Sequence, residues 1–385
     1  MRIAFYAPMK PAGHPLPSGD RLMARLLVST LGLAGHSVEH ASQFRSYDGA
    51  GDPPRQRRLA AIGGRMAERL VRRYQAAPRH RRPELWFTYH LYHKAPDYLG
   101  PRVSRALGIP YVIAEASHAP KQRRGPWAGG HEAAASAIAS AELVLGLNRA
   151  DSKCVLPLLS DPRRLVPLKP FIDTKTGVEA AGQRHRHRDA LTRAYGLDPE
   201  TPLLATAAMM RPGDKLSSYR VLGEALTRLT SRPWQLIVVG DGPARTDVEA
   251  ALAPLGGRVT WLGTLKPDAL AGFFAACDVY VWPAINEAWG MALLEAQAAG
   301  LPVVAGRAGG VADVVTDGQS GYVVPSRDAP AFAEALERFL DDPAARSAFS
   351  ARAREIMMRD YDIGTAAQVL GEALERLILP SEVKP

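Results

Sequence analysis

Apolar residues in the first half of the chain fall in short runs, separated by longer segments in which they recur with helical spacing. The segment 19–36 is one such amphipathic helix, and Gly35 is suited to close it. The apolar runs predict strands at 2–7, 37–42, 84–90, 110–118 and 142–148. Strands that alternate with helices in this way predict a doubly wound parallel sheet.

The alternation stops between residues 169 and 199, where the sequence carries prolines and no regular period, and we predict a linker and the entry to a second domain there. It resumes with predicted strands at 202–210, 234–240, 259–263, 278–284, 301–306 and 320–325. We therefore predict two Rossmann-like domains, residues 1–168 and 200–362, that face a central cleft. Open α/β sheets bind ligands beyond the carboxyl ends of their strands, so the functional residues are expected in the loops there.

Composition narrows the class of protein. The 385 residues are 46% hydrophobic and 23% charged, which is typical of globular proteins. Cys154 and Cys277 are the only cysteines, so a reducing, cytoplasmic environment is expected. The first apolar run is too short for a signal peptide, and no run reaches the ~18 residues of a membrane-spanning helix. The net charge of +9 favours anionic partners.

The stretch "NEAWGMALLEAQAAGLPVVA", residues 286–305, carries the candidate chemistry. Gly290 opens a run of good helix formers that Gly300 ends, and the free N–H groups at the start of such a helix favour a phosphate. Glu287 precedes the helix and Glu295 lies within it, so two carboxylates flank the phosphate position. Such carboxylates would read two sugars joined by a diphosphate, which is a nucleotide sugar. The spacing alone would equally suit an acid that favours the helix dipole and a solvated glutamate.

Residues 286–324, "NEAWGMALLEAQAAGLPVVAGRAGGVADVVTDGQSGYVV", resemble the donor-binding segment of the family 4 retaining glycosyltransferases of the GT-B fold. The two glutamates, the Gly-Leu-Pro-Val-Val strand, the paired Gly309 and Gly310 and the Gly-Tyr-Val-Val end match in order. The resemblance is strongest over residues 200–330. It implies an α/β GT-B fold in which a helix at 363–379 packs back on the first domain.

The resemblance also implies roles for individual residues. Glu287 would bind hydroxyls of the donor sugar, and Glu295 would hold the ribose hydroxyls. Leu265 would contact the base through its backbone. The sugar and the diphosphate would meet the backbone of four further residues, Trp289, Gly290, Met291 and Ala292. The donor would be a nucleotide-diphosphate sugar, with no metal and no other cofactor.

Two cations follow the first predicted strand of the second half. Arg211 and Lys215 stand in a loop that enters a helix, where they are suited to neutralise a diphosphate, although ordinary surface cations would look the same. The family usually places its Arg and Lys one residue further apart and has Gly after Lys, where this chain has Leu216.

In the first half, the family places a glycine-bearing loop and a histidine near the donor. Gly13 and Gly19 fit that loop, or else a simple turn and helix start. His118 ends the strand predicted at 110–118 and is the candidate histidine, with a purely structural histidine as the alternative. The cations that follow it would form an anion site for the acceptor; they are Lys121, Arg123 and Arg124.

Other motifs exclude some functions. The only Asp-x-Asp match, a common metal-binding pattern of sugar-nucleotide enzymes, is Asp360-Tyr361-Asp362, and its place far beyond the donor motif suits a polar turn. "VVGDGPA" has Arg245 where an NAD fingerprint needs its third glycine. The Arg-rich segment 55–82 has helical spacing, and either packs on its own domain or lies on an anionic membrane. No motif indicates nucleic-acid binding.

Together these features predict a cytoplasmic, metal-independent retaining glycosyltransferase of polysaccharide biosynthesis. Its acceptor is expected to be a glycan, lipid-linked or otherwise anionic, and peripheral membrane contact is expected with it. A sugar-nucleotide epimerase or hydrolase of the same fold is one alternative, and it would turn over donor without an acceptor. A non-catalytic module that binds nucleotide sugar is another, and it would release no free nucleotide.

Overall fold

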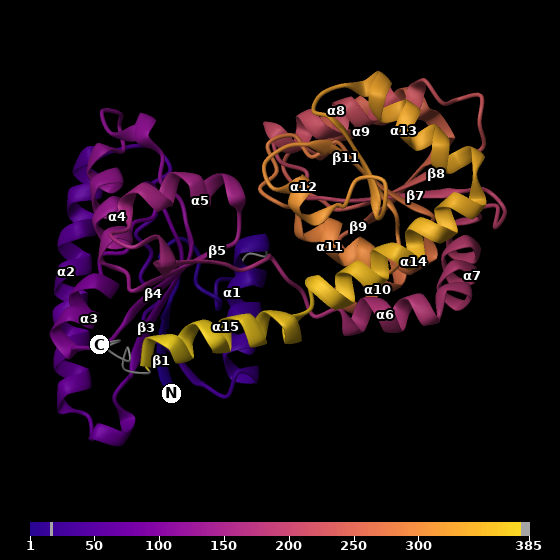
Figure 1. The fold of residues 1–385 in the computed structure, drawn as a ribbon. Helices are drawn as coiled ribbons and strands as arrows, with labels where there is room; N and C mark the ends of the chain where they lie inside the picture. Colours follow the sequence, from indigo (N-terminus) through magenta and orange to yellow (C-terminus); the bar gives the residue numbers. More distant parts are fainter. Residues whose placement is uncertain (16–17, 379–385) are drawn as a thin grey trace. The chain divides into compact units, whose positions relative to one another are not determined.

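The computed structural model describes residues 1–15 and 18–378 of the chain (Figure 1). The chain divides into two compact units. Unit 1 comprises residues 1–171 and the segment that begins at Ile363, and unit 2 comprises Ile172–Asp362. Each unit is built on a parallel six-stranded sheet. None of the helices within the two described ranges has the length and hydropathy needed to cross a membrane.

The sheet of unit 1 has the strand order β2-β1-β3-β4-β5-β6. The inner strands β1, β3 and β4 are runs of buried, mostly apolar residues rather than alternating ones, because helices cover both faces of the sheet, whereas the edge strands β2 and β6 are more exposed. They are β1 Arg2–Tyr6, β2 Ser37–His40, β3 Leu85–Leu91, β4 Tyr111–Ala116, β5 Leu143–Gly146 and β6 Leu165–Pro167.

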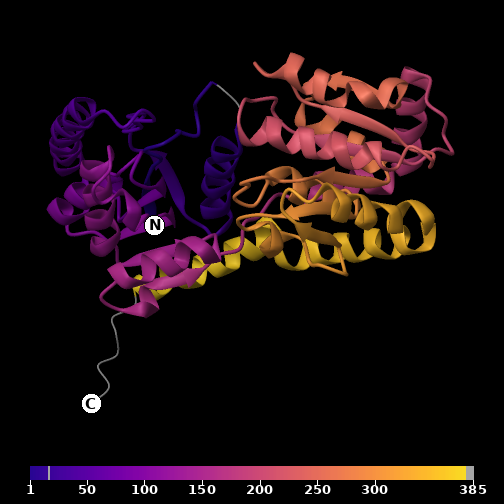
Figure 2. The ribbon, with the colours of Figure 1, turned by 90° about the horizontal axis from the view of Figure 1, so that it is seen from above.

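Two layers of helices cover this sheet. Helices α2, α3 and α4 contact one another and enclose a core with alternate strand residues such as Ala4 and Tyr6, whereas α15 packs against α1 (Figures 1 and 2). The helices are α1 Gly19–Leu33, α2 Pro53–Ala76, α3 Gly100–Leu107, α4 Ala128–Ser140, α5 Arg149–Val155 and α15 Ile363–Ile378. Short 3-10 turns lie at Arg79–Arg81, Pro120–Gln122, Leu156–Leu158 and Pro162–Arg164.

The sheet of unit 2 has the order β12-β11-β10-β7-β8-β9. Its strands are β7 Leu203–Ala207, β8 Gln235–Val239, β9 Val259–Gly263, β10 Val279–Trp282, β11 Val303–Arg307 and β12 Gly321–Pro325. Strands β7 to β9 are added toward one edge of the sheet and β10 to β12 toward the other, so the strand order reverses between β7 and β10. This is a topological switch point, of the kind where open α/β sheets bind ligands.

The helices of unit 2 also form two groups. Helix α8 contacts α9 and α13, whereas α10 and α11 contact α6, and α14 packs on α11. The bounds are α6 Lys175–Gly182, α7 Arg184–Tyr195, α8 Asp214–Thr227, α9 Arg245–Leu252, α10 Pro267–Ala276, α11 Met291–Ala298, α12 Val311–Val314, α13 Ala329–Asp341 and α14 Pro343–Asp360. A kinked 3-10 segment spans Ala253–Arg258.

The segment 169–199, predicted to be a linker and the entry to the second domain, is mostly helical and lies almost entirely in unit 2. Its helices lack a hydrophobic period because small and polar residues make their contacts. In α6, a Cβ on Gly177 would lie 3.0 Å from the backbone of Ala298, so glycine favours this close approach to α11. In α7, Thr192 is the one buried residue.

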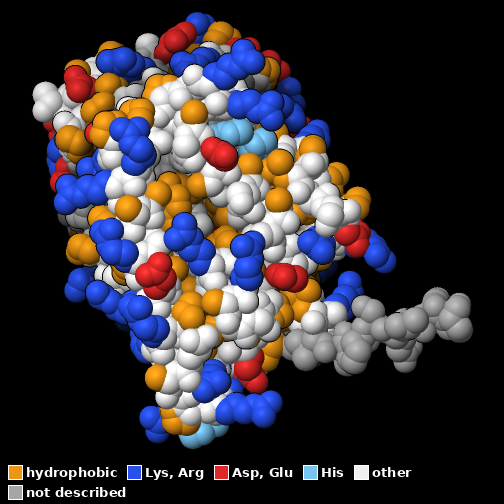
Figure 3. Space-filling view, turned by 90° about the vertical axis from the view of Figure 1, so that its left-hand side faces the viewer, with side chains coloured by type: hydrophobic (Ala, Val, Ile, Leu, Met, Phe, Trp, Pro, Cys, Tyr) orange, Lys and Arg blue, Asp and Glu red, His pale blue; other side chains and the backbone are white. Residues whose placement is uncertain are grey.

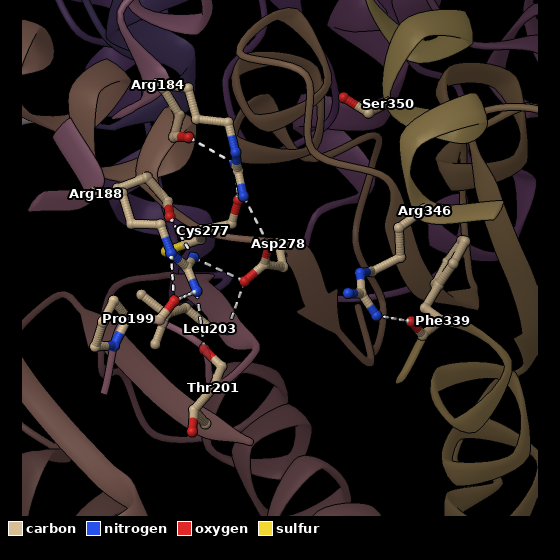
Figure 4. A network of polar contacts seen from close by, with 12 residues as sticks. Arg184, Arg188, Pro199, Thr201, Leu203, Cys277, Asp278, Phe339, Arg346 and Ser350 are labelled. Atoms are coloured by element: carbon tan, nitrogen blue, oxygen red, sulfur yellow. Dashed lines mark hydrogen bonds and ion pairs between the residues drawn. The ribbon is translucent and has the colours of Figure 1, made fainter. Parts of the chain in front are cut away.

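Arginines hold α7 in place (Figure 4). Arg184 and Arg188, one helical turn apart, bind the two carboxylate oxygens of Asp278 at 2.6 and 2.9 Å. They also donate to backbone carbonyls at the end of α10, at 2.8 Å for Ala275 and 3.0 Å for Ala276. Helix α7 is therefore anchored by charge rather than by an apolar stripe.

Candidate functional site

A lysine and a glutamate meet where β10 and β7 end in unit 2. Lys215, in the first turn of α8, forms an ion pair with Oε2 of Glu287. The indole N–H of Trp282, the last residue of β10, donates to the same carboxylate oxygen at 3.3 Å. The ammonium group also lies 5.3 Å from the centre of the Trp282 ring. The site thus holds one carboxylate and one cation in a fixed arrangement against an aromatic wall.

The loop between β10 and α11 has an unusual backbone. Ala284 and Asn286 have φ angles of 53° and 52°, values that residues other than glycine rarely adopt. Hydrogen bonds from helix α8 hold them, because Ser218 Oγ accepts from the Ile285 amide at 3.0 Å and Asp214 accepts from the Asn286 side chain at 2.9 Å. Backbone strain that the surroundings enforce is typical of functional sites.

The paired glycines after β11 press directly on this loop. A Cβ on Gly309 would lie 2.0 Å from the carbonyl oxygen of Glu287, and one on Gly310 would lie 2.5 Å from that of Ala288. The amide of Gly310 donates to the Ala288 carbonyl. The two glycines are therefore required for close backbone approach, and this approach fixes the position of Glu287.

Glu295 lies one turn into α11 and is half-buried. Burial raises the pKa of this carboxyl group to about 7, and no residue of the described chain donates a hydrogen bond to it. Burial, the nearby Tyr219 and then both glutamates of the motif raise the pKa of Tyr280. Glu287 and Glu295 thus both lie close enough to Tyr280 to act on its pKa. This proximity is consistent with two carboxylates that contact one ligand.

The other predicted residues of unit 2 lie in loops at this edge. Gly290, with φ of 77°, directly precedes α11, which starts at Met291 and Ala292, while the Trp289 side chain is buried. Leu265 is half-buried between β9 and α10. Arg211 is exposed, and among the residues the structure describes its side chain has no ion-pair partner.

The glycine-rich turn after β8 packs on the loop that carries Arg211. A Cβ on Gly240 would lie 2.0 Å from the Ala208 carbonyl oxygen, and one on Gly242 would lie 2.3 Å from that of Met210. These glycines therefore serve a tight turn.

In unit 1, the predicted residues lie in the loop after β1, at the start of α1 and after β4. Gly13 is exposed in the loop after β1, and Gly19 is the first residue of α1, where Ser18 caps the helix by accepting from the Arg21 amide at 3.2 Å. The His118 ring packs against His131 of α4, with 4.6 Å between ring centroids. The structure thus groups His118 with another histidine, beyond the end of β4.

A charged cluster that the sequence analysis missed lies at the carboxyl edge of the same sheet. Nδ1 of His90, in β3, is 3.2 Å from a carboxylate oxygen of Asp20 and 3.9 Å from one of Glu115, in β4. Burial alone would lower the pKa of His90, but the charges of Glu115 and Asp20 raise it to about 9. His90 and Glu115 also have positive φ angles of 57° and 60°. The sequence could have indicated His90 and Glu115 only through their positions near the carboxyl ends of two predicted strands.

Comparisons with known proteins agree with this architecture. A glycosyltransferase from Rickettsia africae superposes with a TM-score of 0.74 over 99% of both chains at 14% identity. A structure titled Anabaena Alr3699/HepE in complex with UDP-glucose gives a TM-score of 0.69 at 17% identity, over 98% of this chain and 100% of that one. The fold is therefore the α/β GT-B fold of glycosyltransferases, as predicted.

Sequence comparisons also find similarity to glycosyltransferases. Residues 215–356 match the family model described as glycosyl transferases group 1. A D-inositol 3-phosphate glycosyltransferase of Rhodococcus opacus is 31% identical over 50% of this chain and 44% of its own length. An alpha-D-kanosaminyltransferase of Streptomyces kanamyceticus is 31% identical over 48% and 47%. The chain thus spans about half the length of these relatives.

Proposed function

We propose that the chain is a retaining glycosyltransferase that transfers a sugar from a nucleotide-diphosphate sugar to an acceptor hydroxyl. The observation that carries the proposal is the joint placement of Lys215, Glu287 and Trp282 at the switch point of the unit 2 sheet. The match of residues 215–356 to the group 1 family model supports it, as do structures of similar fold in complex with UDP and glucose and with UDP-glucose.

The donor contacts follow from this placement. Glu287 orients hydroxyls of the donor sugar, and Lys215 together with the first amides of α11 offsets the charge of the leaving diphosphate. Glu295 holds the ribose hydroxyls, and Leu265 contacts the base. Arg211 is an exposed cation without a carboxylate partner in the described chain, which leaves it available to a phosphate. Gly13 and Gly19 are the donor-side candidates of unit 1.

We propose that no metal takes part. Within residues 1–15 and 18–378, no three His, Cys, Asp or Glu side chains are grouped so that they could hold a metal ion. In the Asp-x-Asp match, Asp360 pairs with Arg359 and Asp362 accepts from the Thr174 hydroxyl at 2.6 Å, so both carboxylates have structural partners. Lys215 supplies the positive charge that a metal would otherwise bring to the diphosphate.

We further propose an anionic or lipid-linked acceptor and peripheral membrane contact. Helix α2 buries Ala67 and Leu70 against its own unit, so its apolar face is already used. Its arginines are exposed, and Figure 3 shows many more Lys and Arg than Asp and Glu side chains on this face of unit 1. These arginines are Arg55, Arg57, Arg58, Arg65, Arg69, Arg72 and Arg73. Contact with an anionic membrane would therefore be electrostatic, without insertion of the helix.

A transfer assay with Glu287→Gln tests the proposed reaction. Nucleotide sugars are screened for turnover with an acceptor, and the anomeric configuration of the product is read by NMR. The variant should lose roughly 10²-fold or more in turnover, the scale of one preorganised polar contact at the reacting centre. Glu200→Gln, an exposed glutamate of the same unit, is the matched control. Full turnover by Glu287→Gln would refute the site, and an inverted product would refute the retaining mechanism.

A further inference from the structure

Three histidines of unit 1 are called the histidine cluster here: His93, His118 and His131. The His118 and His131 rings lie 4.6 Å apart between centroids. His93, after β3, lies against the start of α4, because a Cβ on Gly130 would be only 2.1 Å from its carbonyl oxygen. The cluster therefore brings the loops after β3 and β4 onto the first turn of α4.

Three ring nitrogens of this cluster lack partners among the described residues. Both ring nitrogens of His93 and Nε2 of His131 are buried and have no hydrogen-bond partner in the described chain. His131 is only 7% exposed. Buried polar atoms in folded proteins are nearly always hydrogen-bonded, so unpaired ones indicate a group that the protein alone does not supply.

The charges around the cluster are positive. Burial, followed by Lys94, His131 and Lys121, lowers the pKa of His93 to about 4. Burial and then Arg123 lower the pKa of His131. Burial and then His131 lower that of His118; a hydrogen bond with the Cys154 backbone acts in the opposite direction, and Arg123 contributes a smaller lowering. No carboxylate contributes to any of these changes, and Glu132, next in sequence to His131, is exposed.

The cations themselves are also without anionic partners. Lys94, Lys121 and Arg123 form no salt bridge with any residue that the structure describes, and Lys94 lies instead over the Trp127 ring, 4.5 Å from its centre. Unpaired cations around unpaired imidazoles match the needs of an anion with several acceptor oxygens.

We propose that the histidine cluster and these three cations bind a phosphate group carried by the glycosyl acceptor. This inference rests on the proposed glycosyltransferase function, because that function provides the acceptor. A phosphate oxygen would accept from the imidazole N–H groups and be neutralised by the cations. Its negative charge would favour the imidazolium form, so phosphate binding takes up protons and tightens as the pH falls toward the lowered pKa values of these histidines.

Histidine side-chain NMR on the full chain tests this directly. The Cε1–Hε1 signals of the cluster, assigned with single variants, are followed with pH in the absence and presence of inorganic phosphate. Phosphate should raise the pKa of His93 and of His131 by about one or more, the effect of an opposite charge within hydrogen-bonding range. The exposed His80 serves as the internal reference.

Substitution of a cation gives the second readout. Arg123→Gln, at an exposed position, should weaken phosphate binding by about threefold to tenfold through the loss of one partner. Arg81→Gln, an exposed arginine of the 3-10 turn Arg79–Arg81, should leave it unchanged.

Vesicles distinguish the source of the phosphate. A response to inorganic phosphate supports a soluble acceptor phosphate, and a response only to vesicles that contain phosphatidylglycerol supports a lipid-linked one. No pKa change with either probe, or equal effects of the two arginine variants, would overturn the inference. The NMR titration needs no turnover, so this result would leave the glycosyltransferase proposal standing, whereas loss of that proposal would not abolish phosphate binding.

Discussion

Replacement of Glu295 by glutamine should remove a pH dependence that the structure builds into unit 2. Burial raises the pKa of Glu295 from 4.5 to about 7. The folded protein therefore keeps a proton that the unfolded chain releases between these values, so the free energy of unfolding falls as the pH rises through this window. At about 1.4 kcal/mol for each pKa unit, the ionised carboxylate costs the empty protein about 3 kcal/mol at pH 8.

The same proton controls donor binding if Glu295 holds the ribose hydroxyls. A carboxylate accepts two hydroxyl hydrogen bonds better than the neutral acid does. With a pKa of about 7, the ionised fraction rises from about one-tenth at pH 6 to about nine-tenths at pH 8, so donor affinity should rise roughly tenfold. The phosphates of a nucleotide sugar are ionised throughout, so they add no pH dependence of their own.

The assay combines calorimetric titration of a nucleotide sugar without acceptor and urea unfolding, each at pH 6 and pH 8. Glu295→Gln should bind donor with little pH dependence and should be more stable than the wild type at pH 8 but not at pH 4.5. Glu200→Gln, an exposed glutamate, should behave like the wild type. Wild-type binding that does not change between pH 6 and 8, or a variant that keeps the wild-type profile, would refute this reasoning.

Lys215→Ala should lose most turnover, whereas EDTA should leave the wild type near full activity; loss with EDTA and rescue by Mg²⁺ would show that a metal is required. Asp278→Ala should lower the free energy of unfolding by about 3 kcal/mol or more, because it leaves Arg188 as an unpaired, largely buried charge. Urea unfolding would measure this, and a loss below about 1 kcal/mol would contradict it. Since the pKa of His90 is raised from 6.5 to about 9, its ion pairs stabilise the fold below pH 6.5 and lose this effect as the pH rises through 9. In His90→Gln, the free energy of unfolding should not show this fall between pH 6.5 and about 9.

The sheets were predictable because most of their strands are continuous apolar runs. Each predicted strand overlaps an observed one, from β1 to β5 and from β7 to β12. Strand β6 was missed, since its three residues Leu165–Pro167 are too short to give a pattern. Helix α7 was missed for a different reason: its anchors are Arg184 and Arg188, which bind carbonyls and a carboxylate, and a search for apolar periodicity does not detect such contacts.

The candidate site also has a part that the sequence predicts and a part that it does not. Glu287, Gly290 and Glu295 stand within one short motif, so sequence reasoning could find them together. The Trp282 contact with Glu287 depends on where β10 ends, and the grouping of His90 with Asp20 and Glu115 depends on three separate elements that meet only in the folded sheet. Such contacts depend on the topology of the sheet, which the spacing of residues along the chain does not reveal.

The return of α15 to unit 1 affects the order in which the chain can fold during synthesis on the ribosome. Unit 2 is continuous from Ile172 to Asp362, and its ends already meet, because the Ile172 amide donates to the Tyr361 carbonyl at 3.0 Å. Unit 1 is made first, yet α1 lacks its neighbour α15 until the whole of unit 2 has left the ribosome. The earlier unit is therefore the later one to finish folding, and a chain cut after Asp362 would leave the α15-contacting surface of α1 uncovered.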